Sequence, residues 1–204
     1  MSHKPAWMQT QGRPWLRGPG RRVFDNPWIS VTEFDAVAPT GRPAQYGLVG
    51  FKNRALAILP LHEDGTVSLV GQNRLPFGDY SWEIPEGGGP LAEDPLQGAK
   101  RELREETGLV AENWREILRL QLSNSVTDEL AIGYLATGLL QADARPVGDG
   151  TEDIARVRIP FTEALAAVTA GHISDVLTVA MLLKAYHMAH TGALPHALAR
   201  SVLG

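Results

Sequence analysis

Residues 87–109 of this 204-residue chain read GGGPLAEDPLQGAKRELREETGL. The stretch opens on three glycines, which weaken regular structure, and then carries the residues that begin and end a helix. Asp94 is suited to cap the N-terminus, Pro95 to occupy the first helical position, and Gly108 to adopt the left-handed conformation that ends a helix. The sequence therefore predicts a helix from about Pro95 to Thr107.

Three glutamates share one face of this predicted helix. At about 100° per residue, Glu102, Glu105 and Glu106 fall within an arc of roughly 100°. Like charges this close repel unless a cation relieves them, and oxygen ligands favour Mg²⁺ or Mn²⁺ over zinc. The alternative is a solvated helix surface on which Arg101 pairs with Glu105. The glycines just before the helix favour a metal site, because they allow the backbone to approach a ligand closely.

The composition excludes several classes of chemistry. The chain has no cysteine, which excludes disulfide scaffolds, Cys-based zinc sites, iron–sulfur clusters and thiol nucleophiles. Nineteen Lys and Arg against 23 Asp and Glu give a formal charge of −4, which argues against wrapping long nucleic acid. The longest apolar run, near residues 130–140, is well short of the roughly 20 residues that cross a bilayer. We therefore expect a cytoplasmic chain with neither a membrane nor a long nucleic acid as partner.

The rest of the chain alternates β-rich and helical segments. Residues 1–27 lack periodicity and are expected to form an arm, and residues 82–90 are expected to form no regular element. Short runs rich in Val, Ile, Leu and aromatic residues predict strands at 28–37, 45–51, 55–61, 66–75, 114–123, 129–140 and 154–160. Two closing helices would be capped by Thr162 and Ser174. This order predicts an α/β fold in which helices sandwich a mixed sheet.

The stretch 87–109 resembles the Nudix box at every specified position. The matching residues are Gly87, Glu93, Arg101-Glu102-Leu103, Glu105-Glu106 and Gly108-Leu109. A match at so many spaced positions is highly specific. The resemblance implies a Nudix α/β/α sandwich with a mixed sheet and an N-terminal β extension. It also implies hydrolysis of a nucleoside diphosphate linked to another group, with Mg²⁺ or Mn²⁺ as cofactor.

The resemblance also implies roles for the residues of the box. Glu102 and Glu106 are expected to be the leading metal ligands. Glu105 is expected to be a ligand or to hold metal-bound water, and Arg101 to orient the acids. The backbone carbonyl of Glu86, just before the box, is expected to be a further metal contact.

Two motifs before the box indicate a branch of the family. Residues 82–87, WEIPEG, look like the Glu-(Leu/Ile)-Pro-Ala-Gly stretch of ADP-ribose pyrophosphatases and related nucleoside-diphosphate-sugar hydrolases. Residues 70–74 resemble the Gln-x-Arg strand end of the same enzymes. By this resemblance Arg74 reaches a substrate phosphate, or else forms a surface ion pair. Glu83 would line the metal side of the site or fix the loop.

The same branch commonly builds a dimer through an N-terminal β segment. Residues 28–53 are therefore the dimerisation candidate, and a homodimer is expected. An aromatic residue of this segment stacks on the nucleobase in the branch. Trp28 is the candidate for that contact, and an ordinary core or interface tryptophan is the alternative.

A late acidic loop is expected to complete the site. Residues 148–154 resemble the Glu-Asp-Ile region in which the family places an additional carboxylate. Glu152 is the expected metal ligand and general base, with Asp153 second, and a solvated acidic loop is the alternative. Gly150 replaces a further family acid, which leaves the identity of the general base open.

These expectations divide the chain into four parts. They are an arm at 1–27, a β region at 28–53, a Nudix hydrolase domain at 54–190 and a C-terminal tail at 191–204.

The expected function is metal-dependent hydrolysis of a small nucleoside diphosphate sugar to a nucleoside monophosphate and a sugar phosphate. Many ADP-ribose pyrophosphatases carry Pro-Gly after the box, where residues 122–129 here read LSNSVTDE. The sugar is therefore open between ADP-ribose and a hexose linked to GDP or UDP. The alternatives are a nucleotide-binding regulatory Nudix module without turnover, and an RNA-cap or nucleoside-triphosphate pyrophosphohydrolase.

Overall fold

The computed structural model describes residues 4–143 and 153–204. By its internal contacts the chain splits into two units, residues 1–52 with 123–128, and residues 53–122 with 129–204. The border between them in the first half of the chain falls between Lys52 and Asn53. Within the described residues, none of the helices has the length and apolar character needed to span a membrane.

The larger unit is built on two sheets. Its strands are β4 (Asn53–Pro60), β5 (Thr66–Arg74), β6 (Asp79–Glu83), β7 (Glu86–Pro90), β8 (Leu109–Gln121), β9 (Leu130–Gln141) and β10 (Ala155–Pro160). One sheet has the order β7-β4-β9-β8 and the other β10-β5-β6. Strands β4 and β9 run parallel, whereas β4 with β7 and β8 with β9 are antiparallel, so the first sheet is mixed.

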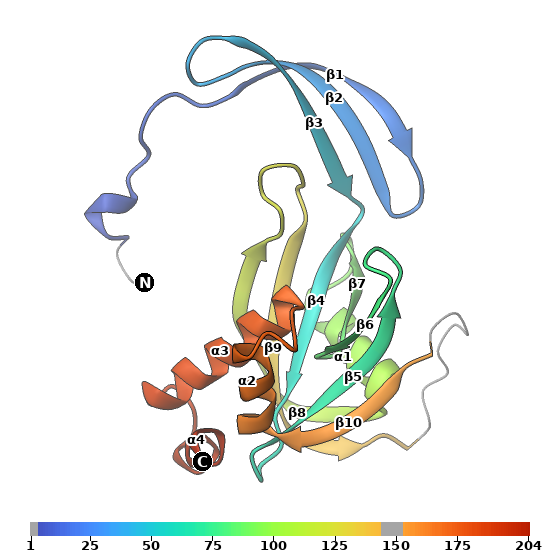
Figure 1. Cartoon of the computed structure of the whole chain (residues 1–204), viewed down its shortest axis with the longest axis vertical. Helices are drawn as coiled ribbons and strands as arrows, with labels where there is room; N and C mark the ends of the chain where they lie inside the picture. Colours follow the sequence, from blue (N-terminus) through green and yellow to red (C-terminus); the bar gives the residue numbers. More distant parts are fainter. Residues whose placement is uncertain (1–3, 144–152) are drawn as a thin grey trace. The chain divides into compact units, whose positions relative to one another are not determined.

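Helices pack on both sides of the sheets of the larger unit, as Figure 1 shows. They are α1 (Pro95–Thr107), α2 (Phe161–Thr169), α3 (Val176–His190) and α4 (His196–Leu203). Because side chains alternate along a strand, Leu56 and Ile58 of β4 face a cluster with α1, whereas Ala57 and Leu59 face α2, α3 and α4. The expected α/β/α sandwich is confirmed, with β4 buried on both faces.

The predicted helix before Gly108 is confirmed at both ends. The carboxylate of Asp94 accepts a hydrogen bond of 2.8 Å from the Leu96 N–H. Gly108 has a φ of 75° and its N–H donates to the Arg104 carbonyl, which ends α1 in the left-handed conformation. The caps predicted for the two closing helices were wrong. Helix α2 begins after Pro160 rather than at Thr162, and Asp175 rather than Ser174 caps α3.

The expectation that residues 82–90 form no regular element was also wrong. Residues Glu86–Pro90 form β7, which pairs with β4. The glycines lie in a strand rather than in a loop, and their lack of side chains allows neighbouring groups to pack closely against it. A Cβ added to Gly87 would lie 2.2 Å from Cδ of Glu102, and one added to Gly89 would lie 2.5 Å from Cδ1 of Leu56. The missing side chain at Gly87 leaves room for the Glu102 carboxylate of α1, and the one at Gly89 leaves room for Leu56 of the neighbouring strand β4.

The C-terminal tail expected at residues 191–204 contains a packed helix. Leu198, Ala199 and Val202 of α4 are buried in the same apolar cluster as α2 and α3. Their spacing places them on one helical face, and burial of that face explains why the segment is ordered.

The smaller unit is an antiparallel sheet of order β1-β2-β3. Its strands are β1 (Leu16–Asp25), β2 (Ile29–Val37) and β3 (Pro43–Phe51), and a short 3-10 helix spans Ala6–Met8. The expectation of an arm at residues 1–27 was therefore wrong for β1. Every residue of β1 is exposed, so the strand has no buried face to produce the alternating pattern that sequence analysis relies on.

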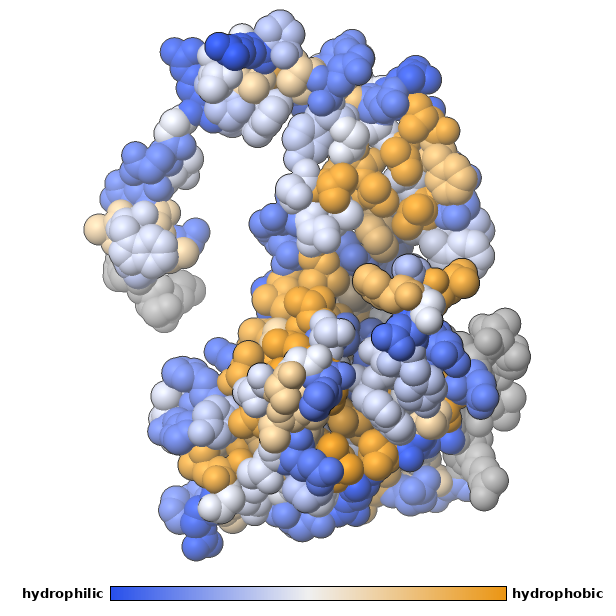
Figure 2. All heavy atoms as spheres, in the orientation of Figure 1, coloured by the Kyte–Doolittle hydropathy of each residue, from blue (hydrophilic) through white to orange (hydrophobic). Residues whose placement is uncertain are grey.

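None of the described residues of the smaller unit is buried. Large apolar side chains exposed on it include Trp15, Leu16, Val23, Phe24 and Trp28. Figure 2 shows apolar residues gathered on the surface over these strands. Contiguous exposed apolar side chains of this kind mark interaction surfaces in proteins.

Candidate metal and substrate site

Helix α1 directs its glutamates to two different environments. Glu102 and Glu106 are 9% and 4% exposed, whereas Glu105 lies at the surface edge. Arg101 donates a hydrogen bond of 2.9 Å to Oε2 of Glu105 and pairs with Glu102 at 2.8 Å. It also donates to the Gly88 carbonyl at 2.9 Å. Arg101 therefore connects the acidic face of α1 to the glycine-rich strand β7.

The first residue of β7 is connected to the same helix. The N–H of Glu86 donates a hydrogen bond of 2.9 Å to Oε2 of Glu106. The absence of a side chain at Gly87 leaves the room that the Glu102 carboxylate fills. Glu86, Glu102 and Glu106, predicted from the sequence as metal contacts, thus lie at one place in the structure.

Arg74, at the end of β5, binds two carboxylates. Its Nε lies 3.0 Å from Oε1 of Glu83, its Nη2 also contacts Glu83, and Nη2 lies 2.8 Å from Oε1 of Glu86. The hydrogen bond to Glu83 is the main cause that raises the pKa of Arg74. Arg74 forms an ion pair, which was the alternative considered from the sequence. The pair is not at the surface, because Glu83, the main partner of Arg74, is only 2% exposed.

Glu86 contributes a side chain where the sequence predicted only a backbone carbonyl. Burial raises the pKa of this carboxyl well above its ordinary value, and the charges of Asp175 and Glu83 raise it further. Its Oε2 is buried and has no hydrogen-bond partner within residues 4–143 and 153–204. This additional carboxyl group could have been noticed in the sequence, because Glu86 occupies the position at which the related stretch has alanine.

Asp175 was missed by the sequence analysis. One carboxylate oxygen each from Glu83, Glu86 and Asp175 lies within 4.8 Å of the others. Asp175 caps α3, far along the chain from the box, and nothing in the local sequence links it to Glu86. Its only local signal is that of a helix cap, which Ser174 shares.

The residues present fit a divalent cation. The donors at β7 and α1 are carboxylate oxygens, which Mg²⁺ and Mn²⁺ prefer. The carboxylates of Glu102 and Glu106 place buried negative charge on one face of α1, and Oε2 of Glu86 finds no hydrogen-bond partner among the described residues. A bound cation would compensate that charge.

For two predicted site residues the described structure gives no position relative to this cluster. Glu152 lies outside the described residues. Trp28 belongs to the smaller unit, where it is 65% exposed and its backbone N–H donates to Oδ1 of Asn26 at 2.9 Å.

Comparison with known proteins identifies the class. A NUDIX domain model matches residues 51–177, which is more than half of the chain. The chain therefore belongs to the Nudix family and is a Nudix pyrophosphohydrolase.

Two relatives indicate the branch, and a solved structure shares the fold. The chain is 34% identical to the ADP-ribose pyrophosphatase of Mycobacterium tuberculosis over 139 residues, 68% of this chain and 67% of the relative. It is 32% identical to the GDP-mannose pyrophosphatase of Yersinia enterocolitica over 140 residues, 64% of this chain and 71% of the relative. A crystal structure of an ADP compounds hydrolase has the same fold, with a TM-score of 0.79 at 18% identity, covering 91% of this chain and 100% of that one. The resemblance to the ADP-ribose pyrophosphatase branch is confirmed.

Proposed function

We propose that the chain hydrolyses the diphosphate linkage of a nucleoside diphosphate sugar to a nucleoside monophosphate and a sugar phosphate. The observation that carries this proposal is the convergence of Glu102 and Glu106 of α1 with the backbone of Glu86. Relatives named for ADP-ribose and for GDP-mannose support the substrate class. Cytoplasmic location, expected from the sequence, is part of the same proposal.

Mg²⁺ or Mn²⁺ is the proposed cofactor. Glu102, Glu106 and the Glu86 carbonyl would hold it, and Glu105 and Glu152 are proposed as further ligands. When bound, such an ion neutralises the diphosphate and lowers the pKa of coordinated water.

The remaining polar residues are proposed to position groups around the diphosphate. Arg101 pairs with both Glu102 and Glu105 and so orients the two carboxylates. Glu105, the most accessible of the three helix acids, is the proposed holder of the attacking water, and Glu152 is the proposed general base.

Substrate contacts are proposed for Arg74, Glu83 and Trp28. The Arg74 side chain is 34% exposed, so part of the guanidinium reaches solvent while Glu83 and Glu86 fix its orientation. That arrangement supports a contact between Arg74 and a substrate phosphate, with Glu83 holding the arginine. The exposed ring of Trp28 supports stacking on the nucleobase.

The test is release of nucleoside monophosphate from ADP-ribose, GDP-mannose and UDP-glucose in the presence of Mg²⁺. We expect turnover of at least one of them, equal yields of nucleoside monophosphate and sugar phosphate, and loss of turnover with EDTA. Nucleotide binding without turnover of any nucleoside diphosphate sugar or dinucleotide would instead indicate a regulatory module. Preference for nucleoside triphosphates or capped RNA in the same panel would indicate the other alternative.

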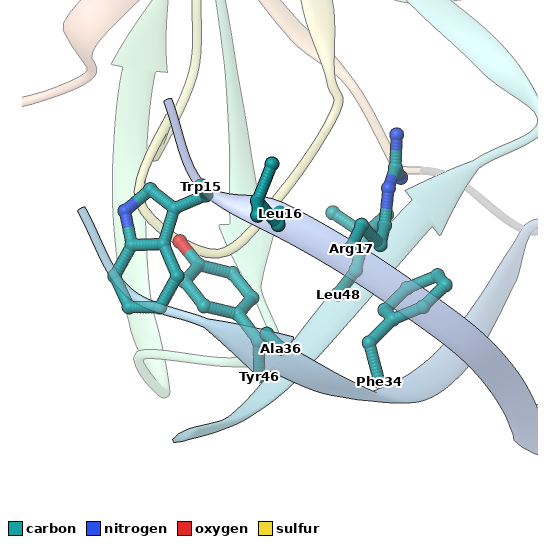
Figure 3. Close-up of a pocket in the computed structure, with 7 residues that line it drawn as sticks. All are labelled: Trp15, Leu16, Arg17, Phe34, Ala36, Tyr46 and Leu48. Atoms are coloured by element: carbon teal, nitrogen blue, oxygen red, sulfur yellow. The ribbon is translucent and has the colours of Figure 1, made fainter. Parts of the chain in front are cut away.

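A homodimer formed through the smaller unit is part of the proposal. A cleft of about 280 Å³ in its sheet is lined by Trp15, Leu16, Arg17, Phe34, Ala36, Tyr46 and Leu48 (Figure 3). The rings of Trp15 and Tyr46 meet edge to face with centroids 5.3 Å apart, and Arg17 lies 5.2 Å from the centroid of Phe34. Exposed aromatic and arginine side chains of this kind are enriched at protein interfaces. A second copy of the chain would supply the missing cover.

The dimer is tested by the mass in solution. Sedimentation equilibrium should give about twice the chain mass of 22.1 kDa. Leu16→Asp, which places a charge on the exposed apolar face, should shift the protein toward monomer because the charge would be buried unpaired. Asp79→Asn, at an exposed position in the larger unit, is the control and should remain dimeric. A monomeric parent at micromolar concentration would contradict this part of the proposal.

A further inference from the structure

The N-terminal turn of α3 is hydrogen-bonded to Ile84, which lies just before β7. The N–H of Ile84 donates a hydrogen bond of 2.9 Å to Oγ1 of Thr178, which is completely buried. The N–H of Thr178 in turn donates to Oδ2 of Asp175 at 2.7 Å, which caps the helix. The hydroxyl and the N–H of Thr178 therefore fix where Ile84 lies and where α3 begins.

Two further hydrogen bonds hold the same short segment. The carbonyl of Pro85 accepts from the Ile58 N–H of β4 at 2.9 Å. The N–H of Glu86 donates to the carboxylate of Glu106 on α1 at 2.9 Å. Residues 84–86 are thus held from three directions, by α3, β4 and α1.

This connection has a consequence for metal binding. Mg²⁺ demands near-ideal octahedral geometry with oxygens at about 2.0–2.1 Å, so displacements of a few tenths of an ångström weaken it. The Ile84 amide lies two residues before Glu86, the carbonyl of which is a proposed ligand. Because only one residue separates them, a displacement of Ile84 also displaces the Glu86 carbonyl. It likewise changes the hydrogen bond between the Glu86 N–H and Glu106.

We propose that Thr178 is a positioning residue of the divalent-cation site. Its hydroxyl oxygen holds residues 84–86 in the place from which the Glu86 carbonyl and the Glu106 carboxylate face one ion, and Asp175 fixes the helix end that carries it. Thr178 touches neither the ion nor the substrate. This inference rests on the proposed function in taking Glu86 and Glu106 as cation ligands.

The test compares Thr178→Val, which keeps the shape and removes the hydroxyl, with Thr178→Ser, which keeps the hydroxyl. Mn²⁺ affinity is measured by electron paramagnetic resonance without nucleotide. Thr178→Val should weaken Mn²⁺ binding about tenfold, the lower end of the loss seen when a group that orients metal ligands is removed. Thr178→Ser should remain within about twofold of the parent.

Ala185→Gly is the matched control on the same helix. Ala185 is fully buried and glycine destabilises a helix interior, so the melting temperature should fall while Mn²⁺ affinity is retained. Parental affinity in Thr178→Val, or an equal loss in Ala185→Gly, would overturn the inference.

The parent protein provides a second measurement that does not depend on how Thr178→Val folds. Hydrogen exchange of the Ile84 amide, followed by NMR, should slow when Mg²⁺ is added, because an ion held by Glu86 and Glu106 stabilises the closed state in which Ile84 donates to Thr178. Unchanged exchange at saturating Mg²⁺ would overturn the inference. Neither measurement uses a nucleotide, so a chain that passes both and hydrolyses no nucleoside diphosphate sugar would contradict only the proposed function.

Discussion

Glu106→Gln should lower the turnover of a nucleoside diphosphate sugar on the order of a thousandfold, the size of loss that follows removal of one group stabilising a transition state. The neutral amide cannot supply the charge that a divalent cation requires. Its oxygen can still accept the hydrogen bond from the Glu86 N–H, so the position of the start of β7 should be retained. The side chains are nearly equal in volume, which matters at a residue packed this tightly.

The same variant should keep its fold. Burial is the main cause that raises the pKa of Glu86, and the charge of Glu106 is among the neighbouring charges that add to it. Replacing that charge with a neutral amide relieves repulsion, so thermal unfolding without divalent cations should occur at or above the parental temperature. Glu116→Gln, an exposed glutamate of β8 paired with Arg119, is the matched control and should retain full turnover. Full turnover in Glu106→Gln would remove Glu106 from the proposed metal ligands.

Helix α1 could be predicted to the residue because its determinants are local. Asp94 caps the helix through an N–H two residues away, and Gly108 ends it through a carbonyl four residues away. The spacing of the acids along the helix likewise follows from its 3.6-residue period. A short window of sequence therefore contains all the information needed.

Strands β1 and β7 could not be predicted, because their determinants are distant. In β7, glycines have low intrinsic strand propensity, and the strand forms because β4 pairs with it and because Glu102 needs the space above Gly87. In β1, pairing with β2 forms a strand that has no buried face and hence no alternating pattern.

The site residues also fall into a group that the local sequence predicts and a group that only the tertiary structure reveals. Its box acids could be predicted from spacing and resemblance, whereas Asp175 and Thr178 reach the site only because α3 packs against the segment before β7. The partners of Arg74 are a further case. The sequence suggested a phosphate contact or a surface ion pair; the ion pair is present, but tertiary packing buries its partner Glu83 beside the guanidinium.

Arg74→Met should lower the free energy of unfolding by about 3 kcal/mol near neutral pH. Glu83 is almost completely buried, and removing its cation leaves a charge without compensation, a change that typically costs about 3–5 kcal/mol. The lower end applies because a third of the Arg74 side chain is exposed, so solvent screens part of the interaction. Urea unfolding in EDTA measures the change without a contribution from bound cations.

The double variant Arg74→Met, Glu83→Met separates the charge from the packing. Replacing both partners removes the buried charge together with its cation, so the double variant should recover more than half of the stability that Arg74→Met loses. Glu83→Met alone leaves Arg74 with Glu86 and with solvent, and should cost less than Arg74→Met. Strictly additive losses in the two single variants would mean that Arg74 does not neutralise Glu83. The arginine would then lack the fixed orientation that its proposed contact with a substrate phosphate requires.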